Sequence, residues 1–360
     1  MRVFFAAGGT AGHIYPAIAI AEIIKNKYPS AEFLFAATKG AMEDRLLGEY
    51  GFHTTYIHIH GLKHKFSLHN LRVLAELPKA VGDAKKALQT FRPHLVIGTG
   101  GYICYPTLRA AQKLGIKTAL HESNAVPGLT VKLLASKTDV LMLSFEDAAA
   151  NFPSHPNCHH VGTPLRDAFG SVNRQKARAA LGIPPQQLCI LSFGGSLGAQ
   201  MLNSTCVKLM NELGEQDDGL TWFHATGQKN YANVAESTKL PPNCHLLPYI
   251  SDMATYMAAA DLVICRAGAS TLAELSTLGK PSILVPYPHA TKQHQLKNAL
   301  SMQRLGGALV VEENEDFDLR LKEALYTFKV DPQKRNYMGM RARLLQGVNV
   351  EQKILSSLGI

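Results

Sequence analysis

The fold of this chain is decided close to its start, where residues 3–13 read VFFAAGGTAGH. The five apolar residues before the glycines form a run that is too short for a signal-peptide core or a membrane span. Such a run is typical of a strand that is buried on both faces of a sheet. The glycines form a turn, and residues 17–27 then carry an apolar helical pattern. This order predicts a parallel α/β architecture.

The same alternation continues along the chain. Apolar runs predict strands over residues 3–7, 32–37, 95–98, 118–121, 140–143, 188–193, 221–225, 262–265 and 282–286. Helical patterns predict helices over residues 17–27, 42–50, 105–114, 199–213, 270–278 and 294–305. Because the strands are almost continuously apolar, we expect parallel sheets with helices on both faces.

The glycine turn recurs in the second half of the chain. Residues 8–12 read GGTAG and residues 194–198 read GGSLG, and each turn directly follows a predicted strand. A second pair, LVIGTGG at 95–101 and LVICRAG at 262–268, has the same context of strand, turn and helix. Two similar doubly wound halves account for both pairs better than one long sheet does.

Length and composition agree with two packed domains. The chain has 360 residues, of which 46% are hydrophobic and 18% charged, and this composition excludes a disordered protein. The six cysteines show no paired spacing, which predicts neither disulfides nor a structural zinc site and indicates a reducing compartment. Prolines cluster near the middle of the chain. We therefore expect an N-terminal domain over 1–160, a C-terminal domain over 161–335, and a helix over 336–360 that packs back on the first domain.

The net charge of +9 implies an acidic partner. Residues 60–92 hold seven Lys or Arg side chains against two acidic ones, with leucines at near-helical spacing. This segment predicts an amphipathic helix, which is either an ordinary helix with its apolar stripe in the core or a basic helix on an anionic membrane surface. Nucleic acid would account for the charge but for no other feature, so we expect no nucleic-acid partner.

The glycine turns predict an anion-binding site, because each exposes backbone N–H groups beside the positive end of a helix dipole. The turns lack the glycine spacing of a dinucleotide fingerprint, and the second strand ends without an acidic residue. They also lack the Lys-Ser/Thr pair of a Walker loop. We therefore expect a phosphate or diphosphate ligand, held between the two halves beyond the strand ends.

Four polar residues near the predicted turns are candidates for chemistry. His13 follows the first turn at a helix N-terminus, where the dipole disfavours imidazolium, so a neutral ring could act as a general base. Glu122 ends a strand at the same expected edge and is the second candidate base. Arg166 is a candidate to clamp a diphosphate, and Glu274 to accept the hydroxyls of a ribose.

Metal ligands are not evident in the sequence. His58 and His60 alternate along a strand pattern and do not converge on their own. The acidic D-x-D motif at 316–318 lies in a surface-like acidic stretch and does not follow an apolar strand. We therefore expect neither a metal nor a cofactor.

Taken together, these motifs resemble the MurG family of peptidoglycan glycosyltransferases, which add N-acetylglucosamine to lipid I. The matching stretches, in the family's order, are residues 8–17, 98–102, 121–124, 162–166, 194–199, 266–274 and 294–299. Ala11 departs from the pattern, because the family usually has glycine there, and a Cβ penalises a positive φ. The resemblance implies two Rossmann-like domains of the glycosyltransferase B type.

The resemblance also implies the reaction. It is a metal-independent, inverting transfer of N-acetylglucosamine from UDP-N-acetylglucosamine to the C4 hydroxyl of the muramoyl sugar of lipid I, which forms lipid II. The implied location is peripheral, on the cytoplasmic side of the bacterial inner membrane, with residues 60–92 on the lipid surface. Other readings of the same fold are a glycolipid glucosyltransferase, a sugar-nucleotide epimerase or a non-catalytic nucleotide-sugar sensor.

Site residues follow from the resemblance, position by position. The implied donor contacts are Thr10, Ala11, Gly12, Asn124, Arg166, Ser196, Ile250, Ala269, Ser270, Thr271, Leu272, Ala273, Glu274 and Gln295. Among these, Ser196 would meet the diphosphate, Ile250 the uracil and Glu274 the ribose. The residues His13, Tyr102 and Glu122 would face the acceptor, and the catalytic base would be His13 or Glu122.

Overall fold

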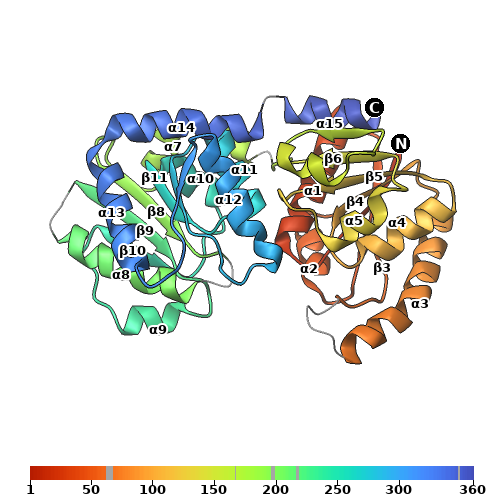
Figure 1. Ribbon diagram of the computed structural model, residues 1–360, viewed down its shortest axis with the longest axis horizontal. Coiled ribbons are helices and arrows are strands. Elements are labelled where there is room, and N and C mark those ends of the chain that lie inside the picture. The colour runs from red at the N-terminus through yellow and green to blue at the C-terminus, as the bar shows by residue number, and fades with distance from the viewer. Residues whose placement is uncertain (62–67, 167, 196–198, 216–218, 348) are drawn as a thin grey trace. The chain divides into compact units, whose positions relative to one another are not determined.

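The computed structural model describes residues 1–61, 68–166, 168–195, 199–215, 219–347 and 349–360. The chain divides into two compact units. The first unit consists of Met1–Arg166 together with Val348–Ile360, and the second consists of Asp167–Gly347. Each unit is built on one parallel sheet (Figure 1).

The sheet of the first unit has seven strands in the order β3-β2-β1-β4-β5-β6-β7. The strands are β1 (Arg2–Ala7), β2 (Glu32–Ala37), β3 (Thr54–Tyr56), β4 (Leu95–Gly100), β5 (Lys117–Glu122), β6 (Val140–Leu143) and β7 (Cys158–His160). The helices are α1 (Ala11–Lys27), α2 (Met42–Glu49), α3 (Leu68–Phe91), α4 (Cys104–Lys113), α5 (Leu129–Ala135), the 3₁₀ turn η1 (Glu146–Asn151) and α15 (Val350–Leu358).

Two hydrophobic cores lie on opposite faces of this sheet. Alternate residues of β1 point to opposite faces, so Phe5 packs in one core and Phe4 in the other. Helices α1 and α15 cover the Phe5 face, and helices α3, α4 and α5 cover the Phe4 face (Figure 1). Burial on both faces explains why the strand sequences are apolar without alternation.

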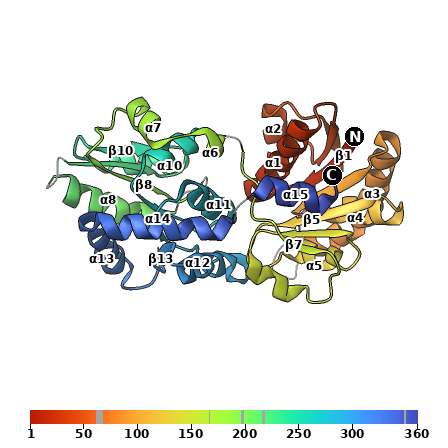
Figure 2. The same ribbon diagram turned by 90° about the horizontal axis from the view of Figure 1, so that it is seen from above.

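The sheet of the second unit has six strands in the order β10-β9-β8-β11-β12-β13. Figure 2 shows this unit from above, with β10, β8 and β13 of the sheet labelled. The strands are β8 (Leu188–Phe193), β9 (Leu220–Ala225), β10 (Cys244–Leu247), β11 (Leu262–Cys265), β12 (Ser282–Leu284) and β13 (Ala308–Val310). The helices are α6 (Ala168–Ser171), α7 (Arg174–Ala180), α8 (Gln200–Gly214), α9 (Tyr231–Glu236), α10 (Met253–Ala259), α11 (Ala269–Leu278), the 3₁₀ turn η2 (Thr291–Gln293), α12 (His294–Arg304), α13 (Phe317–Val330) and α14 (Pro332–Gln346).

The two sheets share one winding, which confirms the prediction of two doubly wound halves. In each, the first strand adds two strands on one side, and the chain then returns to add the rest on the other side. Strands β1 and β8 are therefore equivalent, and so are β4 and β11. These are the strands that carry the repeated sequence pairs. Within each sheet the two strands of such a pair are neighbours, β1 beside β4 and β8 beside β11, and the strand order reverses between them. Ligands bind at this point in open α/β sheets.

The structure adds elements that the sequence did not predict. Strands β3, β7, β10 and β13 are missing from the prediction, and all four are short strands at the edges of their sheets. An edge strand of three or four residues needs no continuous apolar run. Residues 336–360, expected as one helix, form the end of α14 and all of α15, because Gly347 and Asn349 have φ values of 69° and 60°.

Candidate functional site

The loops that follow β1 and β4 meet at the strand-order reversal of the first unit. Gly9 and Gly101 both have a φ of +85°, a conformation that favours glycine. A Cβ on Gly101 would lie 2.0 Å from the carbonyl oxygen of Gly8, so no larger residue fits there without a shift. The predicted glycine turn after β1 therefore packs directly against the backbone of the loop after β4, and only glycine at position 101 allows this contact.

Helix α1 begins directly after this turn, with Ala11 as its first residue and Thr10 at its N-cap. Because Ala11 is helical, the turn does not require a positive φ at this position, and its methyl group adds no backbone strain. Gly12 follows within the first helical turn and is exposed. The departure from the family pattern is therefore compatible with the local backbone.

His13 is held by the turn that precedes it. Its Nδ1 lies 3.1 Å from the carbonyl oxygen of Gly8 and 3.2 Å from Oγ1 of Thr10. A carbonyl oxygen can only accept, so Nδ1 carries a proton in this contact, and in the neutral ring Nε2 is then the nitrogen with a lone pair. The ring packs against Gly100, where a Cβ would lie 2.7 Å from its Cδ2. This is the tautomer that a general base requires.

A buried carboxylate that sequence reasoning missed supports the same turn. Glu43, near the start of α2, is 0% exposed. It accepts hydrogen bonds from the N–H of Gly9 at 3.2 Å, the N–H of Thr38 at 3.3 Å and the hydroxyl of Tyr102 at 2.7 Å. In the sequence, Glu43 looks like an ordinary acidic residue in the first turn of a helix, so no local signal reveals it.

Tyr102, expected to face the acceptor, lies against the glycine turn. Its ring is close to Gly9, where a Cβ would lie 3.1 Å from Cε1 of the tyrosine. Burial raises the pKa of Tyr102 to about 12, and the hydrogen bond to Glu43 adds to the rise. The hydroxyl is therefore a neutral donor that is already engaged within the first unit.

Glu122 ends β5, and its carboxylate organises the loop that follows. Its Oε1 accepts hydrogen bonds from the backbone N–H of Asn124 at 2.9 Å and from the side-chain amide of Asn124 at 3.1 Å. Its Oε2 accepts from the N–H of Gly128 at 2.8 Å. Glu122 is 4% exposed and both of its carboxylate oxygens accept hydrogen bonds from the loop. This geometry suits a residue that positions Asn124.

Arg166 contacts two aromatic residues of the first unit. Its guanidinium carbon lies 4.3 Å from the ring centre of Tyr15, at cation–π distance. Its Nη1 donates to the hydroxyl of Tyr50 at 3.0 Å. Neither tyrosine was among the predicted site residues, because both are far from Arg166 in the sequence and no local pattern links them to it.

The matching turns of the second unit follow β8 and β11. Gly195 has a φ of +87° and open space around the position of its missing Cβ, while Ser196 lies outside the described residues. Helix α11 follows Gly268, which has no side chain to cap the first helical N–H groups. The hydroxyl of Ser270, in that first turn, is buried without a hydrogen-bond partner among the described residues. Such a helix start is suited to an anion.

The other predicted donor residues of the second unit fall into two groups. Buried side chains belong to Ile250, Ala269, Leu272 and Ala273. Half-buried side chains belong to Ser270, Thr271, Glu274 and Gln295.

Two of the half-buried residues have contacts that place them in the fold. Glu274 lies near the end of β11, since its charge adds to the effect of burial in raising the pKa of the Cys265 thiol. The side-chain oxygen of Gln295 accepts from the N–H of Tyr287 at 2.9 Å, so it holds the loop after β12. Six of the predicted donor residues, 269–274, therefore share one helix beside an uncapped turn.

These features define a class of protein: two Rossmann-like domains of the glycosyltransferase B type. Residues 3–142 match the glycosyltransferase family 28 N-terminal domain, and residues 189–353 match the glycosyltransferase family 28 C-terminal domain. The chain belongs to glycosyltransferase family 28.

Two relatives carry the same name, UDP-N-acetylglucosamine--N-acetylmuramyl-(pentapeptide) pyrophosphoryl-undecaprenol N-acetylglucosamine transferase. The chain is 40% identical to the one from Acetivibrio thermocellus, with 98% of this chain and 96% of the relative covered. It is also 40% identical to the one from Desulforudis audaxviator, with 96% and 94% covered.

Solved structures agree with this assignment. MurG of Acinetobacter baumannii has a TM-score of 0.78 and 30% identity, with 99% of both chains covered. A UDP-GlcNAc 2-epimerase from Neisseria meningitidis, solved with UDP-GlcNAc bound, has a TM-score of 0.68 with 99% of both chains covered. At 15% identity this second similarity concerns the fold alone.

Proposed function

We propose that this chain transfers N-acetylglucosamine from UDP-N-acetylglucosamine to lipid I, and so makes lipid II for bacterial peptidoglycan synthesis. The observation that carries the proposal is 40% identity, over nearly the whole chain, to transferases named for this donor and acceptor. Matches to both domains of one glycosyltransferase family agree with it.

The turns of the second unit are suited to the UDP part of the donor. Charge develops on the leaving diphosphate during transfer, and backbone N–H groups fixed at the start of α11 would stabilise it. The buried hydroxyl of Ser270 is an additional polar group for this anion. Residues 269–274, Ser196, Ile250 and Gln295 are the proposed donor contacts of this unit. Those of the first unit are Thr10, Ala11, Gly12, Asn124 and Arg166.

In the proposed reaction, His13 is the general base. Its Nε2 accepts the proton of the C4 hydroxyl while that oxygen attacks the anomeric carbon of the donor sugar. The bond from this carbon to the diphosphate breaks, and UDP leaves with the electron pair. The contact of Nδ1 with Gly8 supports this role, because it keeps the lone pair on Nε2. Glu122 has a positioning role through Asn124, and its engaged carboxylate supports that assignment.

A transfer assay tests the proposed function. Labelled UDP-N-acetylglucosamine and a detergent-soluble lipid I analogue should yield a labelled disaccharide lipid. His13→Ala should lower kcat by about 10²–10⁴-fold, the usual contribution of a general base. Glu122→Gln keeps the isosteric side chain and should cause a smaller loss. Transfer to diacylglycerol, formation of a 2-epimer, or binding of the donor without turnover would reject the proposal in favour of another protein of this fold.

Helix α3 is the proposed contact with the membrane surface. It places Val73, Ala80 and Leu88 in the core, while Leu71 and Leu74 are 49% and 56% exposed. The helix therefore has a buried apolar face and, in addition, exposed leucines among exposed basic side chains. This combination favours an anionic lipid surface, and it supports a peripheral location on the cytoplasmic side of the inner membrane.

Vesicle sedimentation tests this contact. None of the described helices has both the length and the hydropathy to cross a bilayer. We expect the protein to bind vesicles that contain phosphatidylglycerol and not those of phosphatidylcholine alone. The double variant Leu71→Ser/Leu74→Ser should weaken binding at least about tenfold, since two leucine side chains contribute a few kcal/mol. Leu319→Ser, at an equally exposed leucine of α13, is the matched control. Equal binding by both variants would exclude α3 as the contact.

A further inference from the structure

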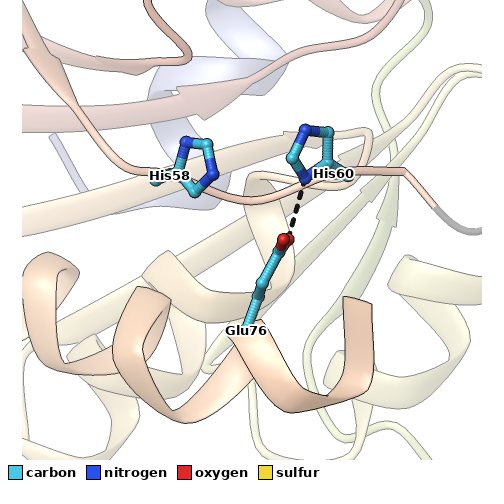
Figure 3. A group of neighbouring side chains, drawn as sticks. All are labelled: His58, His60 and Glu76. Carbon is cyan, nitrogen blue, oxygen red and sulfur yellow. Dashed lines mark hydrogen bonds and ion pairs between the residues drawn. The ribbon is translucent and has the colours of Figure 1, made fainter. Parts of the chain in front are cut away.

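Three side chains with metal-binding atoms converge where the chain after β3 passes α3. They are His58 and His60, which follow β3, and Glu76, in the first half of α3 (Figure 3). One ligand atom from each residue lies within 4.8 Å of the others. The two histidines alone do not form a site, and the glutamate that completes the group is sixteen residues further on.

Local packing explains why both histidines lie on the same side of the segment that follows β3. Ile57 and Ile59 are buried in the core, at 1% and 3% exposure. Because successive side chains of an extended segment point in opposite directions, burial of these isoleucines turns His58 and His60 to the same side. Their ring centres lie 5.1 Å apart, and Figure 3 shows both rings above the carboxylate.

The carboxylate of Glu76 is oriented by two partners, one on each oxygen. Oε2 lies 2.8 Å from Nδ1 of His60, and Oε1 accepts from Nε of Arg72 at 3.0 Å. Without a metal, Nδ1 of His60 donates a proton to this contact, and a bound cation would take the place of that proton. The exposed Arg72 holds the other oxygen, as an outer partner that orients a metal ligand does.

We propose that His58, His60 and Glu76 bind one divalent transition-metal ion of the Zn²⁺ type. Two imidazoles and one carboxylate suit Zn²⁺, Co²⁺ or Ni²⁺, whereas Mg²⁺ and Ca²⁺ prefer oxygen ligands. Ligand distances near 2.1 Å imply separations of roughly 3.4 Å between ligand atoms. The exposed ring of His58 can rotate to close the group to that size. Three protein ligands leave a fourth position for water.

The site would tie the segment 57–61 to the first half of α3. This consequence does not depend on the proposed transferase activity, and metal binding is measured without either substrate. A bound ion should slow amide hydrogen exchange in segment 57–61 and in the part of α3 around Glu76, because local opening would then require loss of the ion.

Metal titration of the full-length protein tests the proposal. After chelator treatment, Co²⁺ should bind with one equivalent, Zn²⁺ should displace it, and Mg²⁺ or Ca²⁺ should not compete. His58→Ala and Glu76→Gln should each raise the Kd for Zn²⁺ at least about tenfold and abolish the change in hydrogen exchange. His53→Ala, at an exposed histidine of the same unit, should leave the Kd unchanged. Circular dichroism of each variant verifies folding, and His58 is exposed, so its truncation is tolerated by the core.

Three results would overturn the proposal. The first is the absence of Co²⁺ and Zn²⁺ binding to the wild-type protein. The second is a Kd that His58→Ala and Glu76→Gln leave unchanged. The third is an intense thiolate-to-cobalt charge-transfer band that disappears in Cys158→Ser, because it would place the ion at the partly exposed Cys158 beside His159 and His160. None of these results bears on transfer to lipid I, so the two proposals fail separately.

Discussion

Replacement of Glu43 by alanine should destabilise the first unit by about 3–5 kcal/mol. The carboxylate is fully buried and accepts three hydrogen bonds. The short contact with the hydroxyl of Tyr102, at 2.7 Å, involves a charged acceptor and contributes about 1.5–3 kcal/mol. The backbone contacts of Gly9 and Thr38, at 3.2 and 3.3 Å, are longer and contribute about 0.5–1.5 kcal/mol each.

The assay is urea denaturation followed by two probes. The chain has a single tryptophan, Trp222, which lies in the second unit, so its fluorescence reports on that unit alone. Circular dichroism reports on both units. We expect Glu43→Ala to shift the circular-dichroism transition to lower urea, with little change in the Trp222 transition if the units unfold separately.

A double-mutant cycle isolates the contact between Glu43 and Tyr102. Tyr102→Phe alone should cost about 1.5–3 kcal/mol, and the same change in a Glu43→Ala background should cost much less, because the acceptor is already absent. Glu43→Gln should cost about 1–3 kcal/mol, since its amide would oppose one of the three donors. A loss below 1 kcal/mol for Glu43→Ala, or additive losses in the double variant, would refute this account of the turn.

Three further predictions concern His224, Gly101 and Arg178. Burial lowers the pKa of His224 to about 4. Between about pH 6.5 and 4 this histidine is therefore protonated in the unfolded chain and neutral in the folded chain. The contribution of His224 to the stability of the second unit should therefore fall by about 3 kcal/mol from pH 6.5 to 4. The urea midpoint of His224→Gln, followed by Trp222 fluorescence, should depend less on pH than that of the wild type; parallel profiles would contradict this. Gly101→Ala should cost more than about 3 kcal/mol in the same assay, because its Cβ would overlap the carbonyl oxygen of Gly8. A variant as stable as the wild type would show that the turn can shift to accept the methyl group. Arg178→Ala should cost about 3–5 kcal/mol, because the largely buried carboxylate of Asp261 would lose its buried partner. Arg174 pairs with the same aspartate but is exposed, so Arg174→Ala should cost below 1 kcal/mol. Equal urea midpoints for the two variants would refute this difference.

The sequence by itself determined the central strands, the glycine turns and the repetition of one doubly wound unit. These features are local, because a strand buried on both faces must be apolar at every position, and a turn against a neighbouring backbone must be glycine. The same pattern placed His13 in the first turn of the helix after the first glycine turn and Glu122 at the carboxyl end of its strand. It could not reveal the edge strands, which have few apolar positions and are defined by their neighbours.

Only the tertiary structure decided which side chains meet. Glu43 of α2 accepts a hydrogen bond from Gly9 in the turn before α1, Arg166 lies against Tyr15, and Glu76 completes a group with His58 and His60. Each contact joins residues that are far apart in the chain, and it depends on the strand order and on how each helix is rotated on its sheet. Neither hydrophobic periodicity nor motif spacing encodes those two quantities, because many packings satisfy the same pattern until the whole core is assembled.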